Sequence, residues 1–304
     1  MEKSMVDVIK KIRKMVNGTM DEQDIYGLKT GFAALDDLMY GLHDGQMILI
    51  GAGSGLGKRS FALNIMHHVA TKEGIPVAYF SLEESSEQIY SRLLSIDSMV
   101  ELDHIKSGEM DDEEILKINK SKMNLEQAPI HIIDDLEYFN VSNLERKCIE
   151  LKREESIGLI ILDYFQLLDA DCDNNIQLTL NGKRQEKMSA VSGIIKEMAV
   201  KLDIPVVVLA SLRYRSLSMR EDHKPKMEDL RFLGNIESDA DVILFIHRDD
   251  YYDSDNSDDS DDSEKPGVAE IIVAKHRNGA VGTIELTWIS KYSKYANIER
   301  NPGI

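Results

Sequence analysis

Short apolar runs alternate with helix-like segments along most of the chain, from Gly27 onward. The runs are continuous rather than alternating with polar residues, which is typical of strands buried on both faces of a parallel sheet. Helical periodicity follows over residues 60–74, from about residue 86, and over 193–203. The pattern predicts an α/β domain with a doubly wound, mainly parallel sheet and helices on both faces. The predicted strands are residues 47–52, 76–83, 128–134, 157–168 and 204–211.

The last apolar runs lie close together, over residues 240–248, 268–277 and 282–289, with no helical segment between them. Strands joined by short connections pair in antiparallel fashion. We therefore expect an antiparallel edge on the parallel sheet.

The N-terminus carries apolar residues at helical spacing, with basic residues between them, and predicts an amphipathic helix over about residues 4–17. Polar residues 17–27 follow it. The expected division is a separate helix within residues 1–20 and one domain over 21–304. The apolar face of this helix needs a partner, either on its own domain or on a neighbouring chain.

The net charge of −18 is concentrated in part in residues 253–264, which hold seven acids and no base and leave −11 for the rest. Such a run predicts a disordered surface loop. Any nucleic-acid contact must then come from a local basic patch. Two distant cysteines, no signal peptide and no apolar run of membrane length favour a cytoplasmic protein.

The segment "GAGSGLGKRS", residues 51–60, resembles the phosphate-binding pattern G-x-x-x-x-G-K-[ST] and follows a predicted strand. Backbone N–H groups of the loop would face the phosphates, and Lys58 would reach the β and γ phosphates. An ordinary Gly-rich turn is the alternative. The candidate nucleotide-binding residues are Gly53, Ser54, Gly55, Leu56, Gly57, Lys58, Arg59 and Ser60.

Two positions depart from the pattern, since Ala52 replaces the first glycine and Arg59 replaces the hydroxyl that ligates Mg²⁺. A guanidinium has donors and no acceptor, so it cannot ligate a cation. Ser60 lies one residue later and is rotated by ~100° around the helix. Arg59 would instead place its own charge on the phosphates, which predicts nucleotide binding with slow hydrolysis.

Two acids at strand ends complete the predicted site. Asp163 ends the run "LIILD", where a nucleotide hydrolase holds Mg²⁺. Glu83 ends the run "AYFSLE" and is the candidate to orient and deprotonate the attacking water. Glu84 and Glu87 compete with it as acids at a helix N-terminus.

The segments "GLKTGFAALDDL", "FSLEESSEQ", "LIILDYFQLL", "MEDLRFLGNIESDADVILFIHRDDYY" and "EIIVAKHRNGAVGTIEL" occur in this order. Together they resemble the C-terminal motor domain of the DnaB-type replicative DNA helicases, from about Gly27 to Glu299. The resemblance implies a RecA-type fold, a hexameric ring around single-stranded DNA, and ATP with Mg²⁺ between adjacent subunits.

The resemblance also implies roles for single residues. Lys58 would be the phosphate-loop lysine, Glu83 the catalytic glutamate and Asp163 the aspartate that holds the metal. Lys275 and Arg277, in "AKHRNG", would reach the γ-phosphate of the neighbouring subunit. The helix over 4–17 would be the linker that docks on the adjacent motor domain.

The candidate DNA-binding residues are Arg231, Gly234, Arg184 and Arg213. Without the resemblance, a basic cluster of this kind is more often a solvated surface. The chain departs from the family twice more, with Ser211 in place of a glutamine and Phe232 in place of an acid.

The expected function is ATP-dependent translocation on single-stranded DNA and duplex unwinding in replication. The alternative is a hydrolysis-deficient paralogue that binds nucleotide and loads, caps or inhibits a true replicative helicase. Another RecA-type ATPase, of the recombination or clock type, fits the motifs less well. The implied partners are single-stranded DNA, a homohexamer or a mixed ring, and a loader or primase, in a cytoplasmic, nucleoid-associated setting without a membrane.

Overall fold

The computed structural model describes residues 27–169, 180–253 and 267–298, together with Met5 and Ile9. The predicted helix over residues 4–17 lies outside the described residues apart from these two positions. The predicted disordered loop over 253–264 lies outside them as well, except for its first residue.

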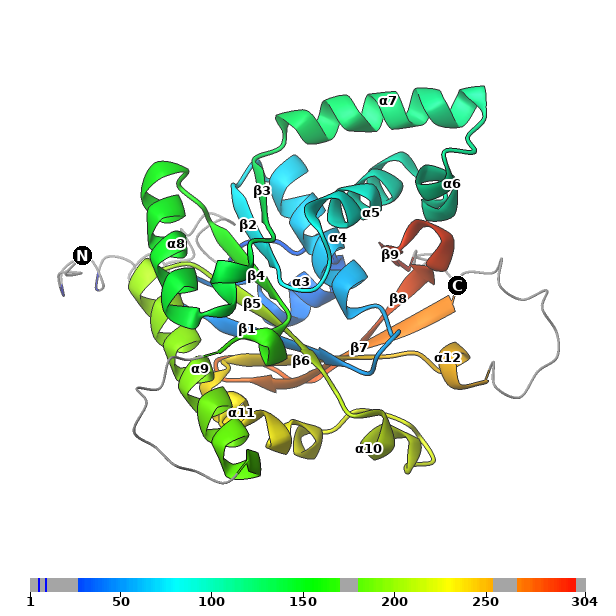
Figure 1. Ribbon diagram of the computed structural model, residues 1–304. Coiled ribbons are helices and arrows are strands. Elements are labelled where there is room, and N and C mark those ends of the chain that lie inside the picture. Colours follow the sequence, from blue (N-terminus) through cyan, green and yellow to red (C-terminus); the bar gives the residue numbers. More distant parts are fainter. Residues whose placement is uncertain (1–4, 6–8, 10–26, 170–179, 254–266, 299–304) are drawn as a thin grey trace.

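One sheet of nine strands runs through the described part of the chain, in the order β3-β2-β4-β5-β1-β6-β7-β8-β9 (Figure 1). The six strands from β3 to β6 are parallel, and β7, β8 and β9 extend the sheet in antiparallel fashion. Both the parallel sheet and its antiparallel edge are therefore confirmed. The strands are β1 Met47–Ala52, β2 Val77–Ser81, β3 Ile130–Ile133, β4 Leu159–Asp163, β5 Val206–Ser211, β6 Val242–His247, β7 Gly267–His276, β8 Gly282–Ile289 and β9 Lys294–Asn297.

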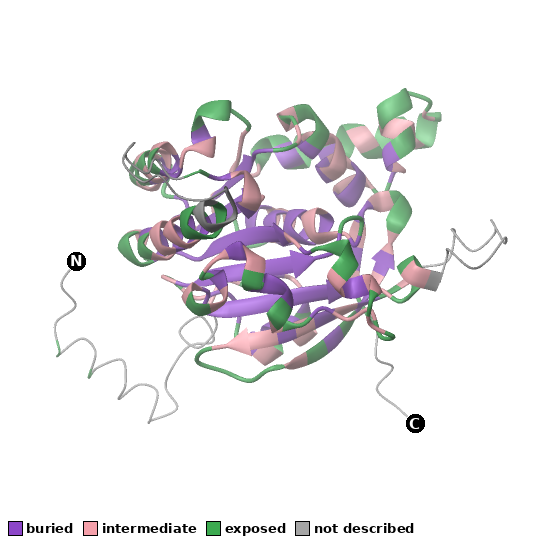
Figure 2. Ribbon diagram, turned by 60° about the horizontal axis from the view of Figure 1, so that its bottom comes forward, coloured by how far each residue is buried: buried purple, intermediate pink, exposed green. Residues whose placement is uncertain are grey.

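Helices cover both faces of the sheet (Figure 2), and the central strands β1, β2, β4, β5 and β6 are almost completely buried. The helices α3, α4 and α5 pack on one face, and α8, α9 and α11 pack on the other. The α-helices are α3 Ala33–Met39, α4 Lys58–Thr71, α5 Ser86–Ser98, α6 Leu102–Ser107, α7 Asp112–Gln127, α8 Val141–Glu154, α9 Leu180–Leu202, α10 Tyr214–Ser218, α11 Ile236–Asp239 and α12 Asp250–Asp253. The 3-10 helices are η1 Leu136–Phe139, η2 Phe165–Leu167, η3 Met227–Leu233 and η6 Ser290–Tyr292.

The element boundaries differ from the predicted ones where a local signal competes with the apolar pattern. The apolar run over 157–168 forms a strand only up to Asp163, after which the chain turns into η2. The polar helix α7 was not predicted from the sequence, although Asp111 and Glu114 form a capping box at its start. The short strand β9 also had no predicted counterpart.

The strand order brings four loop segments to one edge of the sheet. Ser81 pairs with Asp163, and Ala52 pairs with Ser211, so the carboxyl ends of β2, β4, β5 and β1 lie together. Ligands of open α/β sheets bind at this edge. The amino-terminal starts of β1 and β6 lie at the opposite edge, beside the carboxyl end of β7.

Candidate functional site

The phosphate loop connects β1 to α4, and the helix begins at Lys58 without a side-chain cap. The first N–H groups of such a helix have no partner within it and are free to bind an anion. Gly57 precedes the helix in the left-handed region, with φ at 89°. A Cβ atom at Gly57 would lie 2.4 Å from the Tyr295 hydroxyl, so only glycine fits here.

Tyr295, on the late strand β9, supports this loop. Its hydroxyl donates a hydrogen bond of 3.1 Å to the carbonyl of Leu56, and its ring meets that of Phe61 edge-on, with 5.3 Å between centroids. Burial raises the pKa of Tyr295, so the hydroxyl stays protonated as a donor. Tyr295 could not be singled out from the sequence, because nothing in its local pattern links it to a loop so distant in the chain.

Arg59 points from the first turn of α4 toward three carboxylates. Its Nε donates to Asp163, one terminal nitrogen contacts Glu83, and the other lies 2.7 Å from Glu84. Asp163 is fully buried at the end of β4, whereas the Glu83 side chain is half exposed. All three nitrogens of the guanidinium therefore contact acids of the chain itself.

The contacts around Arg59 continue into a longer network. Arg92 of α5 donates two hydrogen bonds to Glu84, of 3.0 and 2.9 Å. Tyr79 of β2 donates to Asp163 at 2.7 Å. Burial alone would lower the pKa of Arg59, but the hydrogen bond and charge of Asp163 raise it above the ordinary arginine value. Arg59 is therefore a permanent cation in this site.

The residues present do not fit Mg²⁺ while Arg59 holds this position. A divalent cation needs oxygen ligands, and the guanidinium is bonded to Asp163 and Glu83, the acids that the resemblance assigns to metal and catalysis. The position after Lys58 contributes donors and no acceptor. Among the described residues, no group of three or more acidic, histidine or cysteine side chains is arranged to hold a metal ion.

Lys58 lies beside this cluster and partly faces the ring of Tyr164, 5.8 Å from its centroid. Burial lowers the pKa of Lys58 from its ordinary value, and the charge of Arg59 lowers it further, whereas Asp163 acts in the opposite direction. An arriving polyphosphate would favour the charged lysine. Ser60 is buried in the same turn of the helix.

Gln166 ties the loop after β4 to the end of β5. Its side-chain amide donates to the carbonyl of Ser211 at 2.6 Å and accepts from the backbone N–H of Ser211 at 3.3 Å. Gln166 therefore binds the backbone of Ser211, the position at which the resemblance implies a glutamine. Gln166 could not be singled out from the sequence, since its pairing with Ser211 depends on the sheet order.

Lys275 and Arg277 lie at the opposite edge of the sheet. Lys275 pairs with Ile243 near the start of β6, whereas the phosphate loop follows the far end of the six-residue strand β1. A strand of that length spans ~20 Å. These two side chains therefore cannot reach a nucleotide on the loop of their own chain.

Backbone oxygens bind both cations, and Arg277 also pairs with a carboxylate. Lys275 donates to the carbonyls of Glu237 and Ala240, both at 2.7 Å. Arg277 contacts the carbonyl of Ser238 and lies 3.3 Å from Asp241. Arg277 is 45% exposed, so a neighbouring molecule has access to it.

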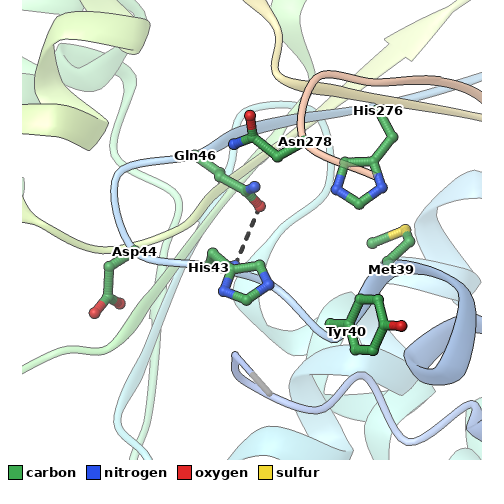
Figure 3. A pocket seen from close by; sticks show the side chains of 7 residues that line it. All are labelled: Met39, Tyr40, His43, Asp44, Gln46, His276 and Asn278. Carbon is green, nitrogen blue, oxygen red and sulfur yellow. Dashed lines mark hydrogen bonds between the residues drawn. The ribbon is translucent and has the colours of Figure 1, made fainter. Parts of the chain in front are cut away.

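A pocket of about 450 Å³ lies at this same edge (Figure 3). His276, which lies between Lys275 and Arg277 in the sequence, lines the pocket from β7. Tyr40 and His43 line it from the segment after α3. His43 and Gln46 are joined there by a hydrogen bond of 3.2 Å. The pocket belongs to the edge of Lys275 and Arg277, and not to the phosphate loop.

The predicted DNA-binding residues come from three segments that the structure brings together. Gln185, next to Arg184 on α9, donates to the carbonyl of Arg231 at 3.2 Å. The guanidinium of Arg213 stacks on the ring of Phe232, 4.3 Å from its centroid. Arg184, Arg213 and Arg231 are all exposed. We call these three arginines, with Phe232, the arginine surface.

Gly234 has a packing role at this surface. It takes a φ of 72°, and a Cβ atom there would lie 2.6 Å from the backbone nitrogen of Ser189. The neighbouring N–H of Asn235 donates to the hydroxyl of Ser189 at 3.1 Å. Gly234 thus lets the turn after η3 approach α9 closely enough to hold Arg231 beside it.

Residues 27–297 match the family model of the DnaB-like helicase C terminal domain. The chain belongs to this family. It is 38% identical over 277 residues to the replicative DNA helicase DnaB of Geobacillus stearothermophilus and 37% identical to the replicative DNA helicase DnaC of Bacillus subtilis. These matches cover 91% of the chain and 58% of each relative, so the chain spans under two thirds of their length.

Solved structures agree with this assignment. One solved ATPase domain superposes with a TM-score of 0.84 at 29% identity, covering 98% of this chain and all of that one. A structure of a DnaB-like replicative helicase, described with its interactions with primase, reaches 0.80 at 28% identity, over 98% of this chain and 68% of that one. The RecA-type fold expected from the sequence is confirmed. None of the described helices is long and apolar enough to cross a membrane.

Replacing Tyr295 by Phe tests the support of the phosphate loop. The change leaves the buried carbonyl of Leu56 without its partner, which should lower the free energy of unfolding by about 1–3 kcal/mol. Affinity for an ATP analogue should fall with it, because the loop loses its anchor. Urea unfolding and analogue titration measure the two effects, and Tyr138→Phe, a change in a tyrosine of η1, is the matched control. An unchanged stability and affinity would show that the loop holds its shape without this bond.

Proposed function

We propose that this chain is the nucleotide-driven motor of a DnaB-type DNA helicase, which binds ATP at residues 53–60 and moves on single-stranded DNA. The observation that carries the proposal is the meeting of the phosphate loop, Lys58, Glu83 and Asp163 at the carboxyl edge of the sheet. Fold alone would not assign an activity. Here the relatives that match nearly the whole chain are named replicative DNA helicases.

Lys275 and Arg277 would act on the nucleotide of a neighbouring subunit. Their position at the amino-terminal edge supports this role, because the phosphate loop of their own chain lies at the other edge. A contact between unlike edges is head-to-tail, and such contacts close into rings when the rotation per subunit permits. We therefore propose a ring, most simply a hexamer, with a nucleotide at each subunit boundary.

Single-stranded DNA would bind along the arginine surface. Guanidinium groups pair with phosphates and stack on bases, and single-strand binding relies on both. The ring of Phe232 holds Arg213 and leaves its charge available. An acid at position 232 would pair with that charge instead. A primase or a loader would be further partners, and the motor would work at the nucleoid in the cytoplasm.

A second candidate function is favoured by one observation, the capture of Glu83 and Asp163 by Arg59. In this interpretation the chain binds nucleotide, hydrolyses it poorly and joins, loads or caps a true helicase. ATP turnover with single-stranded DNA separates the two candidates. Turnover that single-stranded DNA stimulates supports the motor, and none above background supports the accessory subunit.

Replacing Lys58 by Ala tests the nucleotide site. Loss of a charge-assisted contact to phosphate removes ~1.5–3 kcal/mol, which is about tenfold or more in affinity. We expect that drop in the affinity for a fluorescent ATP analogue, and loss of any turnover. Lys72→Ala, at the other end of the same helix, is the control. Equal affinities of Lys58→Ala and the unmodified chain would remove the loop from consideration.

Mixing two inactive variants tests the action across subunits. Arg277→Ala should bind nucleotide normally and lose turnover by ~10³-fold or more, the usual value of an arginine supplied in trans. Lys58→Ala retains Arg277 but lacks the nucleotide site. A mixture of the two should recover turnover, measured with radiolabelled ATP, because one variant supplies Arg277 to the loop of the other.

Recovery in the mixture requires assembly, which light scattering follows under the same conditions. The double variant Lys58→Ala/Arg277→Ala is the control partner for Arg277→Ala, because neither chain of that mixture supplies Arg277. Turnover by Arg277→Ala alone at the level of the unmodified chain would contradict the action in trans, as would a mixture that stays inactive while it assembles.

Replacing Phe232 by Asp tests the arginine surface. A carboxylate beside Arg213 would pair with it and withdraw one cation from the DNA, so the slope of log affinity against log salt should fall by about 1. Fluorescence anisotropy with a labelled oligonucleotide measures that slope. Phe232→Leu removes the ring without adding charge, and it should change the slope little. A slope unaffected by the acid would place the DNA elsewhere.

A further inference from the structure

We propose that Arg59 is a built-in cation that takes the place of the divalent metal, so that this chain binds nucleotide without one. The inference rests on the proposed nucleotide site and adds how that site is charged. Arg59 stands where the phosphate-loop pattern has Ser or Thr, and its guanidinium lies among the acids of the site.

The guanidinium uses each of its nitrogens on a different carboxylate. Nε donates to Asp163, Nη2 contacts Glu83, and Nη1 lies 2.7 Å from Glu84. A second approach, from Nη2 to the other oxygen of Asp163, measures 3.4 Å. The side chain of Arg59 is 16% exposed, so it is held within the site rather than extended into solvent. One planar cation thus joins three acids, as a bound metal ion would.

The buried acid cannot easily release this cation. Asp163 has no exposed surface, and its second hydrogen-bond donor, Tyr79, is neutral. A buried carboxylate without a cation is strongly destabilising. A metal would therefore have to displace Arg59 from Asp163 and at the same time overcome repulsion from the guanidinium. The geometry favours Arg59 over a metal ion at these oxygens.

The charges of the cluster balance without a metal. The three acids that Arg59 contacts face Lys58, Arg59 itself and Arg92, which pairs with Glu84, and Lys106 also acts on Glu84. A neutral residue at position 59 would remove the cation that is bonded to Asp163 and Glu83 and leave their charge beside the phosphates, where a divalent cation would then offset it. With Arg59 present, Lys58 and the N–H groups of the loop face the polyphosphate without that excess of negative charge.

The test is the affinity of the full chain for a fluorescent ATP analogue, in buffer with Mg²⁺ and in buffer with EDTA at equal ionic strength. The unmodified chain should bind equally in both, within about twofold, which is under ~0.5 kcal/mol. Arg59→Thr restores the hydroxyl of the pattern. Its affinity should fall at least about tenfold in EDTA, the size of one lost charged contact, and recover with Mg²⁺.

Arg220→Thr is the matched control. Arg220 has the same exposure of 16% and binds two acids, Asp229 at 2.6 Å and Glu228 at 2.8 Å, neither of which contacts Arg59. Its replacement removes an equivalent arginine, and binding should stay independent of Mg²⁺. If the affinity of Arg220→Thr for the analogue also depended on Mg²⁺, the effect of Arg59→Thr would reflect a general loss of structure. That result would overturn the inference.

Thermal unfolding without nucleotide gives a second readout. Mg²⁺ should raise the Tm of Arg59→Thr more than that of the unmodified chain, because only the variant exposes its carboxylates to the metal. All variants carry the same acidic run over 253–264, so Mg²⁺ binding to that run contributes equally to each Tm shift. The difference between the Tm shifts therefore reports on the site of Arg59. An equal shift in both proteins would overturn the inference.

The outcomes separate the two proposals. Analogue binding by the unmodified chain that is lost in EDTA and restored by Mg²⁺ overturns the role of Arg59 and leaves the nucleotide site standing. No binding in either buffer overturns the nucleotide site, and the inference falls with it. The comparison of buffers on the unmodified chain is decisive even where Arg59→Thr fails to fold.

Discussion

The buried carboxylate of Asp163 imposes the constraint on which the site depends, because it must have a cation beside it. Arg59 meets this need from the first turn of α4 and at the same time binds Glu83 and Glu84 after β2. One side chain thereby fixes the start of the helix relative to two strand ends. The shape of the phosphate loop follows from these contacts beside Lys58, together with the support that Tyr295 gives from β9.

The sheet separates two halves of the chemistry. The nucleotide loop and its acids lie at the carboxyl edge, and Lys275 and Arg277 lie at the amino-terminal edge, a strand length away. In the proposed motor, a single chain would therefore hold the nucleotide but lack the cations for its turnover. Head-to-tail assembly in the proposed ring would supply them. The antiparallel extension β7 is what carries the two cations to that edge.

The sequence predicted well what is local. The buried strands followed from their apolar runs, and β1 has the bounds that were predicted. Lys58, Glu83 and Asp163 were predicted as site residues because each ends or follows such a run, and the structure brings them to one edge of the sheet, while their roles stay predictions. Pairings between distant segments were not found, among them Tyr295 with Leu56, because they depend on strand order rather than on spacing. The orientation of Arg59 belongs to this group. Its donors were expected on the phosphates, yet the pairing of Ser81 with Asp163 brings the acids after β2 and β4 together beside it.

In the proposed ring, Arg59 and Arg277 would act on different nucleotides, and this separation would connect the two candidate functions. The capture of the acids by Arg59 affects only the loop of its own chain. Arg277 is exposed at the other edge, and its contacts to Ser238 and Asp241 involve no residue of the phosphate loop. A subunit of this kind would keep its own nucleotide bound while it supplies cations to the next subunit. In a ring of identical chains every boundary would then turn over slowly. In a mixed ring, the boundary at which this chain serves a neighbour with an ordinary phosphate loop would turn over at the full rate of that neighbour. Under the two proposals, the composition of the ring would therefore decide between a slow motor and an accessory subunit of a true helicase.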